Sequence, residues 1–426
     1  MYILGINISH HPSSCLIKDG EILYFVEETK IIRDKKFDYQ EGLFFDKDFR
    51  NPKYDSFYPS IDILKKYTDT VDYVIFSSYG QQQFDEKIIE IIGKKLDDSG
   101  ITYKTKLFYH ENHHVYHAAN SFYFSGFDDA VALVMDGGGS YDKEFYEKVI
   151  EGQFEYPFRE SESIYKCDYD NGFTPLFKHY SLFDKDNQED EVFVVTKESP
   201  YKEFFTHSIS CGSYFAVLAN LYDTGDDSAG KIMGLSSYGD ADYSKNPILE
   251  KSFFYEMNGE WVTDPFPFDV VVDIMNDLDL DSDLNNFNNI FKDFNFKDLH
   301  VDSYSNKTAN LVTKTSENKD LFDKYQKFIK YATIAKKCQV ETERQTIRLI
   351  QKALDLSGSK NVVLSGGYFL NCVNNFNYLK HFPDVNFFVD PIAFDAGTSI
   401  GAAKWLYHGL TGDKTKRPLE TLYLGK

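Results

Sequence analysis

The stretch that decides the fold is "HHVYHAANSFYFSGFDDAVALVMDGGG", residues 113–139. It opens with His113 and His117, whose spacing places both imidazoles on one face of an α-helix. The apolar run "AVALVM" that follows predicts a buried β-strand, and this strand ends in Asp136 and three glycines. Imidazoles near a strand-end carboxylate make a candidate metal site. A surface cluster of histidines without a metal would account for the same two residues about equally well.

Two glycine turns carry the next signal. In the turn after Asp136, and again at Gly366 and Gly367, small residues let backbone N–H groups approach an anion or a planar ligand. Asn371 follows the second turn and is placed to contact the edge of such a ligand. A tight hairpin turn in the first case, and a strand–helix turn with a capped helix in the second, remain open as alternatives.

A similar pattern of strand, turn and strand occurs at the N-terminus. Residues 2–28, "YILGINISHHPSSCLIKDGEILYFVEE", predict three strands joined by short turns. Its repetition predicts a duplicated α/β architecture, with an N-terminal lobe over residues 1–200 and a C-terminal lobe over residues 201–426.

Other segments give coarser predictions. Residues 330–354 predict a long helix, and the glycine-punctuated segment 227–240 predicts a loop. Residues 269–307 are rich in Asp and Asn but lack the loop glycine and terminal Glu of an EF-hand, so they predict a solvated, partly helical insertion rather than a calcium site.

Composition narrows the function classes. The 426 residues are 42% hydrophobic and carry a net charge of -21, which opposes non-specific binding of duplex DNA. The five cysteines have neither zinc spacing nor a disulfide pattern. The N-terminus is no signal peptide and no long apolar run predicts a membrane span, so we expect the reducing cytoplasm.

Five segments in fixed order carry a family resemblance. Residues 2–28 and 113–139 are followed by "GKIMGLSSYGD" (230–240), "VVLSGGYFLNCVNN" (362–375) and "PIAFDAGTSIGAAKWL" (391–406). Together they resemble the O-carbamoyltransferases that modify antibiotics and nodulation factors, whose transfer domain is similar to the tRNA threonylcarbamoyl-transfer proteins. The resemblance runs from about Tyr2 to Leu424, and it implies the two-lobed, actin-like nucleotide-binding fold shared with sugar kinases and Hsp70.

The resemblance also implies a metal site. In that family the HxxxH helix supplies two ligands of a divalent metal, and carboxylates from the two later motifs complete the set. The matching residues are His113, His117, Asp136 and Asp395. Two imidazoles and two carboxylates suit Fe²⁺, Mn²⁺ or Zn²⁺ better than Ca²⁺.

ATP or carbamoyladenylate is the second implied ligand. The residues expected to hold it are Gly137, Gly138, Gly139, Gly230, Lys231, Gly366, Gly367 and Asn371. His11 matches an early histidine of the family and is the candidate catalytic base or orienting residue, although it could equally be a turn residue. Asp226 and Asp227 are the alternatives. The chain departs from the family at Pro12, where Asp is usual, and at Ala229, where Glu is usual.

The implied reaction moves a carbamoyl group from carbamoyladenylate or carbamoyl phosphate to an acceptor hydroxyl. Family members usually continue into a second domain that makes the adenylate. Because this sequence stops at residue 426, we expect either a separate adenylate-forming protein or direct use of carbamoyl phosphate.

The acceptor is the least constrained expectation. Compact members resemble those of viral genomes, which implies 5-hydroxymethylcytosine as acceptor and the host cytoplasm as location. The negative charge favours a nucleotide over DNA, unless a local basic groove exists. A sugar or antibiotic-like acceptor is an alternative, and so is a catalytically inactive nucleotide-binding module. A sugar kinase is disfavoured, because such kinases hold Mg²⁺ with carboxylates and phosphates.

Overall fold

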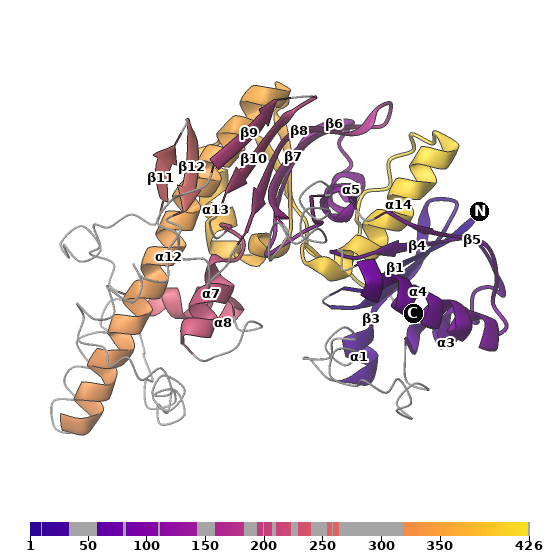
Figure 1. The fold of residues 1–426 in the computed structure, drawn as a ribbon, viewed down its shortest axis with the longest axis horizontal. Coiled ribbons are helices and arrows are strands. Elements are labelled where there is room, and N and C mark those ends of the chain that lie inside the picture. Colours follow the sequence, from indigo (N-terminus) through magenta and orange to yellow (C-terminus); the bar gives the residue numbers. More distant parts are fainter. Residues whose placement is uncertain are drawn as a thin grey trace. The chain divides into compact units, whose positions relative to one another are not determined.

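The first sheet of the computed structural model is built around the N-terminal strands. It has five strands in the order β3-β2-β1-β4-β5, in which β1 is antiparallel to β2 but parallel to β4. Figure 1 shows β1 and β4 side by side. β2 and β3 are antiparallel, and β4 and β5 are parallel. The strands are β1 (Tyr2–Asn7), β2 (Ser13–Lys18), β3 (Glu21–Glu27), β4 (Thr70–Ser77) and β5 (Thr102–Phe108).

The second sheet repeats this topology. Its strand order is β14-β13-β6-β7-β8-β10-β9, so β8-β7-β6-β13-β14 has the order and the strand directions of the first sheet. The strands are β6 (Asp129–Met135), β7 (Arg159–Asp168), β8 (Gly172–Ser181), β9 (Val194–Glu198), β10 (Lys202–Thr206), β13 (Asn361–Ser365) and β14 (Asn386–Val389). The duplicated, actin-like α/β fold predicted from the sequence is confirmed.

Two helices occupy equivalent places in the two repeats. Helix α5 (His113–Ser125) follows β5, and helix α14 (Thr398–Thr411) follows β14. Helix α14 packs on β1, β2 and β4, α5 packs on β6 and β13, and the two helices pack on each other. The pair therefore forms a layer between the sheets, and its apolar side chains fill the core. Ile400 packs with Ile3 and Ile75, and Phe122 packs with Ala132.

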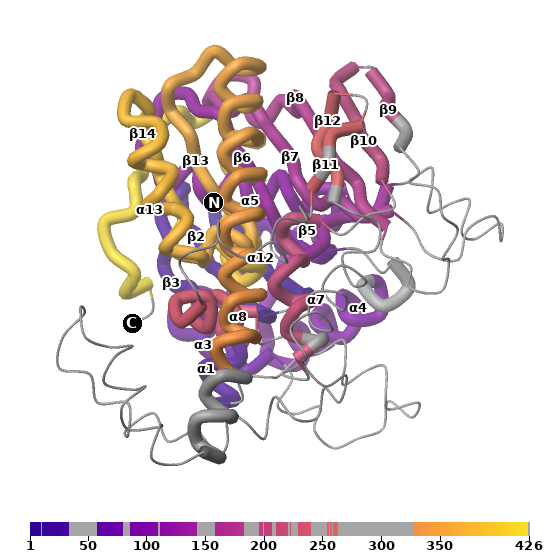
Figure 2. The backbone as a smooth tube through the Cα atoms, turned by 90° about the vertical axis from the view of Figure 1, so that its left-hand side faces the viewer, coloured from indigo at the N-terminus to yellow at the C-terminus, as the bar shows by residue number. Residues whose placement is uncertain are grey.

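The remaining described elements belong partly to the same unit as this framework and partly to a second one. They are α1 (Glu28–Ile32), α3 (Ser60–Leu64), α4 (Gln82–Asp98), α7 (Tyr214–Leu221), α8 (Ala229–Leu235), the hairpin β11 (Phe254–Met257) and β12 (Glu260–Thr263), α12 (Lys319–Ser357) and α13 (Cys372–His381). Helix α12, orange in Figure 2, confirms the long helix predicted at 330–354 and begins earlier.

The prediction of a loop at 227–240 was wrong, because helix α8 begins at Ala229. The glycines there suggested a loop, but Ile232 and Leu235, three residues apart, are both buried on one face of the helix. Tertiary burial therefore overrides the weak local preference of the glycines.

The structure describes residues 1–9, 11–33, 58–79, 82–109, 111–142, 158–182, 194–198, 200–206, 210–222, 229–239, 254–257, 259–263 and 319–424. The insertion predicted at 269–307 lies outside these ranges. The chain divides into two compact units, one of Met1–Gly212 with Ile347–Lys426 and one of Ser213–Thr346. The lobe boundary expected at residue 200 stays a prediction. Within the described ranges, no helix combines the length and apolarity needed to cross a membrane.

Candidate metal centre

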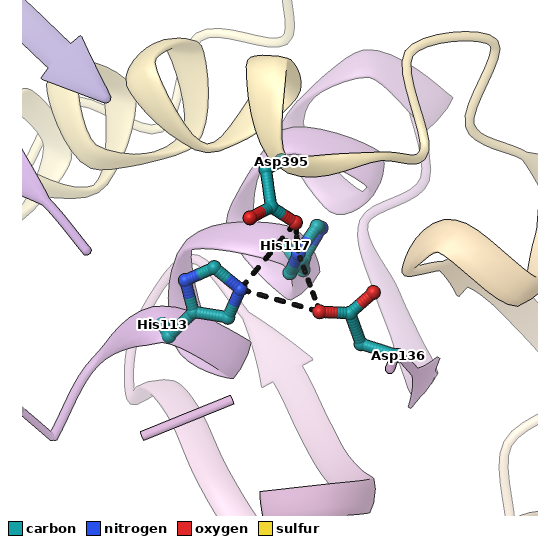
Figure 3. A group of neighbouring side chains, drawn as sticks. All are labelled: His113, His117, Asp136 and Asp395. Carbon is teal, nitrogen blue, oxygen red and sulfur yellow. Dashed lines mark ion pairs between the residues drawn. The ribbon is translucent and has the colours of Figure 1, made fainter. Parts of the chain in front are cut away.

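Four side chains from three elements converge in the first unit (Figure 3). His113 is the first residue of α5, and His117 lies one turn later on the same face. Asp136 directly follows β6, and Asp395 begins the short 3-10 turn before α14. One ligand atom from each residue lies within 4.8 Å of all the others, and all four residues are buried. The structure thus brings together the four residues predicted as metal ligands.

The distances within this cluster suit a shared ion better than direct hydrogen bonds. His113 Nε2 lies 3.4 Å from Asp136 Oδ2 and 3.7 Å from Asp395 Oδ1. His117 Nε2 lies 3.6 Å from Asp395 Oδ1 and 3.9 Å from Asp136 Oδ2. Ligand atoms at about 2.1 Å from a common ion are roughly 3–4 Å apart.

The ring nitrogens of the two histidines also lack other partners. Among the described residues, no ring nitrogen of His113 or His117 has a hydrogen-bond partner, although all four of these atoms are buried. Buried polar atoms are nearly always satisfied, by protein, water or an ion. The cluster therefore fits a divalent cation in both its donor set and its unsatisfied atoms.

Each carboxylate is held by its outer oxygen. The Gly367 N–H donates to Asp136 Oδ1 at 3.0 Å, and the Ser9 hydroxyl contacts Asp395 Oδ2 at 2.9 Å. The other oxygen of each group faces the histidines. Such outer contacts fix the orientation of metal ligands. Ser9 was missed by sequence reasoning, since a single serine after a strand has no motif of its own.

Electrostatics in the cluster favour a positive charge. Burial opposes a charge on His113, but the carboxylates of Asp395 and Asp136 outweigh it and raise the pKa of His113 to about 10. Burial and Asp395 would raise the pKa of Asp136, yet the two histidines lower it overall. Burial would also raise the pKa of Asp395, but His113 holds this pKa well below its usual range. The neighbouring His114 differs, because burial lowers its pKa well below the ordinary value.

The glycine turns pack against this centre. Gly366 has a φ of +101°, and a Cβ there would lie 2.1 Å from the Met135 carbonyl oxygen. A Cβ on Gly139 would lie 2.6 Å from the His114 ring. These two glycines therefore allow close approach within the protein itself. Asn371 caps α13 by accepting a hydrogen bond from the Asn374 N–H at 3.3 Å, as the capped-helix alternative predicted.

Of the other predicted site residues, the structure describes His11, Gly230 and Lys231 but not the two aspartates. His11 has a φ of +56°, and its ring packs edge-on against Phe394, the residue before Asp395, at 5.0 Å between centroids. Gly230 and Lys231 lie exposed on α8 in the second unit. Asp227 and its neighbour Asp226 lie outside the described residues. Nucleotide contacts and the catalytic role of His11 stay predictions.

Comparison with the structure of full-length HypF agrees with this architecture. In solved structures, full-length HypF in the phosphate- and nucleotide-bound form is similar with a TM-score of 0.50 and 13% identity, over 97% of this chain and 47% of that chain. HypF from T. kodakarensis gives a TM-score of 0.49 and 13% identity, over 96% of this chain and 48% of that chain. At this identity the likeness to full-length HypF shows the fold alone.

A curated relative is similar along almost the whole chain. The uncharacterized protein sll1178 of Synechocystis sp. (strain ATCC 27184 / PCC 6803 / Kazusa) is 26% identical over 440 residues, covering 96% of this chain. The chain spans 57% of the length of that relative. The sequence model described as "Carbamoyltransferase N-terminus" matches residues 2–404. The chain therefore belongs to the carbamoyltransferase N-terminus family, as the order of its motifs predicted.

Proposed function

We propose that this chain is a carbamoyltransferase that acts on an acceptor hydroxyl and holds a divalent cation with His113, His117, Asp136 and Asp395. The observation that carries the proposal is the buried convergence of these four side chains around ring nitrogens with no hydrogen-bond partner. The donor set favours Fe²⁺, Mn²⁺ or Zn²⁺. When bound, the cation would supply Lewis-acid polarisation of a carbamoyl or phosphate oxygen.

The chain's own residues would bind the donor and move a proton. The turns at 137–139 and 366–367 border Asp136, and we place an adenylate or phosphate against them. The N–H groups of Gly139, Gly366 and Gly367 already donate to the Glu160 and Ala393 carbonyls and to Asp136, so the turns would hold this ligand by close approach of the backbone. The acceptor oxygen then bonds to the carbamoyl carbon, adenylate or phosphate leaves with the bonding electrons, and the hydroxyl proton passes to a base. His11 is the candidate base, supported by its place beside Phe394, and Asp227 is the alternative.

Donor and acceptor are the finer parts of the proposal. The donor is carbamoyl phosphate itself, or carbamoyladenylate made from it with ATP by this chain or by a partner protein. We propose 5-hydroxymethylcytosine in a mononucleotide as acceptor, because the net charge of -21 repels a polyanion more than a single phosphate. DNA, a sugar and an antibiotic-like molecule are alternative acceptors. No disulfide joins the five cysteines in the described part of the chain, which supports the reducing cytoplasm as location.

A transfer assay tests this function. The protein is incubated with Mn²⁺, carbamoyl phosphate, ATP and three acceptors: hydroxymethyl-dCMP, an oligonucleotide with the same base, and an aminoglycoside. Mass spectrometry should show one added carbamoyl group on the mononucleotide. Reaction of the aminoglycoside alone would reassign the acceptor, and reaction of the oligonucleotide alone would overturn the charge argument. Nucleotide binding without transfer, even from supplied carbamoyladenylate, would instead identify an inactive binding module.

The charge on His113 predicts how cation binding depends on pH. Its pKa of about 10 in the ion-free protein, against an ordinary 6.5, means that the ring carries a proton at pH 7. A cation needs the neutral ring, so binding should release about one proton. The apparent Mn²⁺ affinity should rise about tenfold between pH 7 and pH 8. Calorimetry in buffers of different ionisation enthalpy measures both effects.

The folding stability of the ion-free protein depends on pH in the opposite direction: it falls as the pH rises, whereas cation affinity increases. In the ion-free protein, the raised pKa of His113 stabilises the fold fully below pH 6.5, and this contribution is lost as the pH rises through about 10. Equal Mn²⁺ affinity at pH 7 and pH 8 without proton release would show that His113 is neutral in the ion-free protein.

Ser9 offers a sharp test of the outer contacts. Ser9→Ala removes the hydroxyl that contacts Asp395 Oδ2, so Mn²⁺ affinity should fall about 10-fold or more. Ser13→Ala is the matched control: its buried hydroxyl bonds to the Ala396 carbonyl and the Ser399 hydroxyl on the same turn, without touching Asp395. Equal losses in the two variants, measured by Mn²⁺ electron paramagnetic resonance titration, would assign the effect to the turn and not to the carboxylate.

A further inference from the structure

An arginine is held between two tyrosines at the edge of the candidate metal centre. Arg159 is the first residue of β7, and its guanidinium carbon lies 5.3 Å from the ring centre of Tyr79 and 4.5 Å from that of Tyr141. Arg159 also donates a hydrogen bond to the Tyr141 hydroxyl. All three residues are half-buried. The two aromatic faces thus fix a planar cation that solvent can still reach.

This arginine borders the glycine turn after Asp136. A Cβ on Gly138 would lie 3.4 Å from Arg159 Cδ and 3.8 Å from Nη1, so the missing side chain leaves room beside the guanidinium. Tyr141 pairs with Arg159 across an isolated β-bridge. Tyr79 packs edge-on against His113, with 6.3 Å between ring centroids. Arg159 therefore stands next to the turn, and Tyr79 lies against both Arg159 and one predicted metal ligand.

The charge of Arg159 has no carboxylate partner among the residues that the structure describes. In the described part of the chain no Asp or Glu pairs with it, although the protein as a whole is strongly acidic. The adjacent Glu160 is already paired with Lys178. Other arginines behave differently: Arg417 pairs with Glu21 and Asp413. A rigid guanidinium with unused donors, beside a glycine turn, has the chemistry that recognises phosphate.

We propose that Arg159, positioned by Tyr79 and Tyr141, binds a phosphate group of the substrate that occupies the Gly137–Gly139 turn. The inference rests on the proposed function, which supplies two sources of such a group. One is the donor, carbamoyl phosphate or its adenylate, and the other is a phosphorylated acceptor such as a nucleotide. Either source presents the same chemistry to the guanidinium, namely phosphate oxygens that accept two parallel N–H bonds.

Direct binding tests the site without using activity. Isothermal titration calorimetry with inorganic phosphate and with dCMP should show about 10- to 100-fold weaker binding in Arg159→Gln than in the wild type. Deoxycytidine, which has no phosphate, should bind both proteins equally. Arg159→Lys should recover part of the affinity, because it keeps the charge and loses the planar fork. Thermal unfolding of each variant confirms that the fold is intact.

A matched control separates local from long-range charge effects. Arg344→Gln changes the net charge by the same amount at an exposed arginine that pairs with Glu341, and it should bind phosphate like the wild type. Equal phosphate affinity in wild type and Arg159→Gln, or no phosphate binding by the wild type, would overturn the inference. Neither result depends on whether carbamoyl transfer is observed, so the two proposals fail separately.

Steady-state kinetics then distinguish the two phosphate sources. If Arg159 binds the donor, Arg159→Gln should raise KM for carbamoyl phosphate with every acceptor. If it binds the acceptor, KM should rise for hydroxymethyl-dCMP and stay unchanged for the corresponding nucleoside. Either pattern supports a phosphate site at Arg159, and unchanged KM values for all these substrates would contradict it.

Discussion

His117→Ala is expected to remove the bound divalent cation and to lower carbamoyl transfer by at least about 100-fold, because loss of even an outer contact to a metal ligand costs about 10- to 100-fold. The His117 ring is buried and its Nε2 faces both Asp395 and Asp136. Alanine supplies no ligand there. Elemental analysis of the purified protein should show the metal content falling from about one ion per chain to a small fraction.

The fold should survive this substitution. Alanine has the highest helix propensity, and the ring that it replaces makes no hydrogen bond among the described residues. His381→Ala, at the exposed end of α13, is the control for removing an imidazole elsewhere. Undiminished metal in His117→Ala would overturn the proposed ligand set, whereas loss of helical circular dichroism would show a structural role for the ring.

The residues of the candidate metal centre were predictable in two different ways. His113 and His117 follow from spacing alone, since α-helical geometry fixes which residues share a face. Asp136 follows from its place at the end of an apolar strand. Asp395, however, lies far away in the sequence and was assigned through the family resemblance. Only the packing of α14 on α5 brings it to the histidines, and no local pattern contains that contact.

Single residues without a motif were missed for the same reason. Ser9 and Arg159 take their proposed roles from partners on other elements, Asp395 in one case and Tyr79 in the other. The helix at Ala229–Leu235 was missed because its glycines favour a loop locally, while burial of its apolar face decides otherwise. Sequence therefore predicted the repeated strands, whose patterns are local, better than the contacts between repeats.

The duplication gives a physical reason for the site's position. Helices α5 and α14 follow equivalent strands of the two sheets, so their N-terminal ends come from the same place in each repeat. His113 begins one helix, and Asp395 directly precedes the other. Packing the two helices together therefore joins half a site from each repeat. The distance between helices α5 and α14 should then control cation binding. Gly401, at the contact between the two helices, allows a test of this expectation.

Gly401→Ala is expected to lower the free energy of unfolding by roughly 2–4 kcal/mol, because it forces a methyl group into a backbone contact. A Cβ on Gly401 would lie 1.9 Å from the Tyr116 carbonyl oxygen and 3.1 Å from the Asn120 nitrogen. Both are backbone atoms of α5, so no side chain can turn aside and the helices must separate. Chemical unfolding can be followed by the fluorescence of Trp405, which lies on the same helix.

Gly409→Ala is the matched control on α14. Nothing lies within 4 Å of a Cβ at Gly409, which is exposed, so this substitution should stabilise the helix by about 0.5–1 kcal/mol through helix propensity alone. Mn²⁺ affinity should fall in Gly401→Ala, since Tyr116 lies between His113 and His117 and moves with them, and should be unchanged in Gly409→Ala. Stabilisation of both variants to the same extent would show that the helices are not in close contact. A destabilised Gly401→Ala that binds Mn²⁺ like the wild type would show that the helix contact supports the fold without setting the geometry of the four ligands.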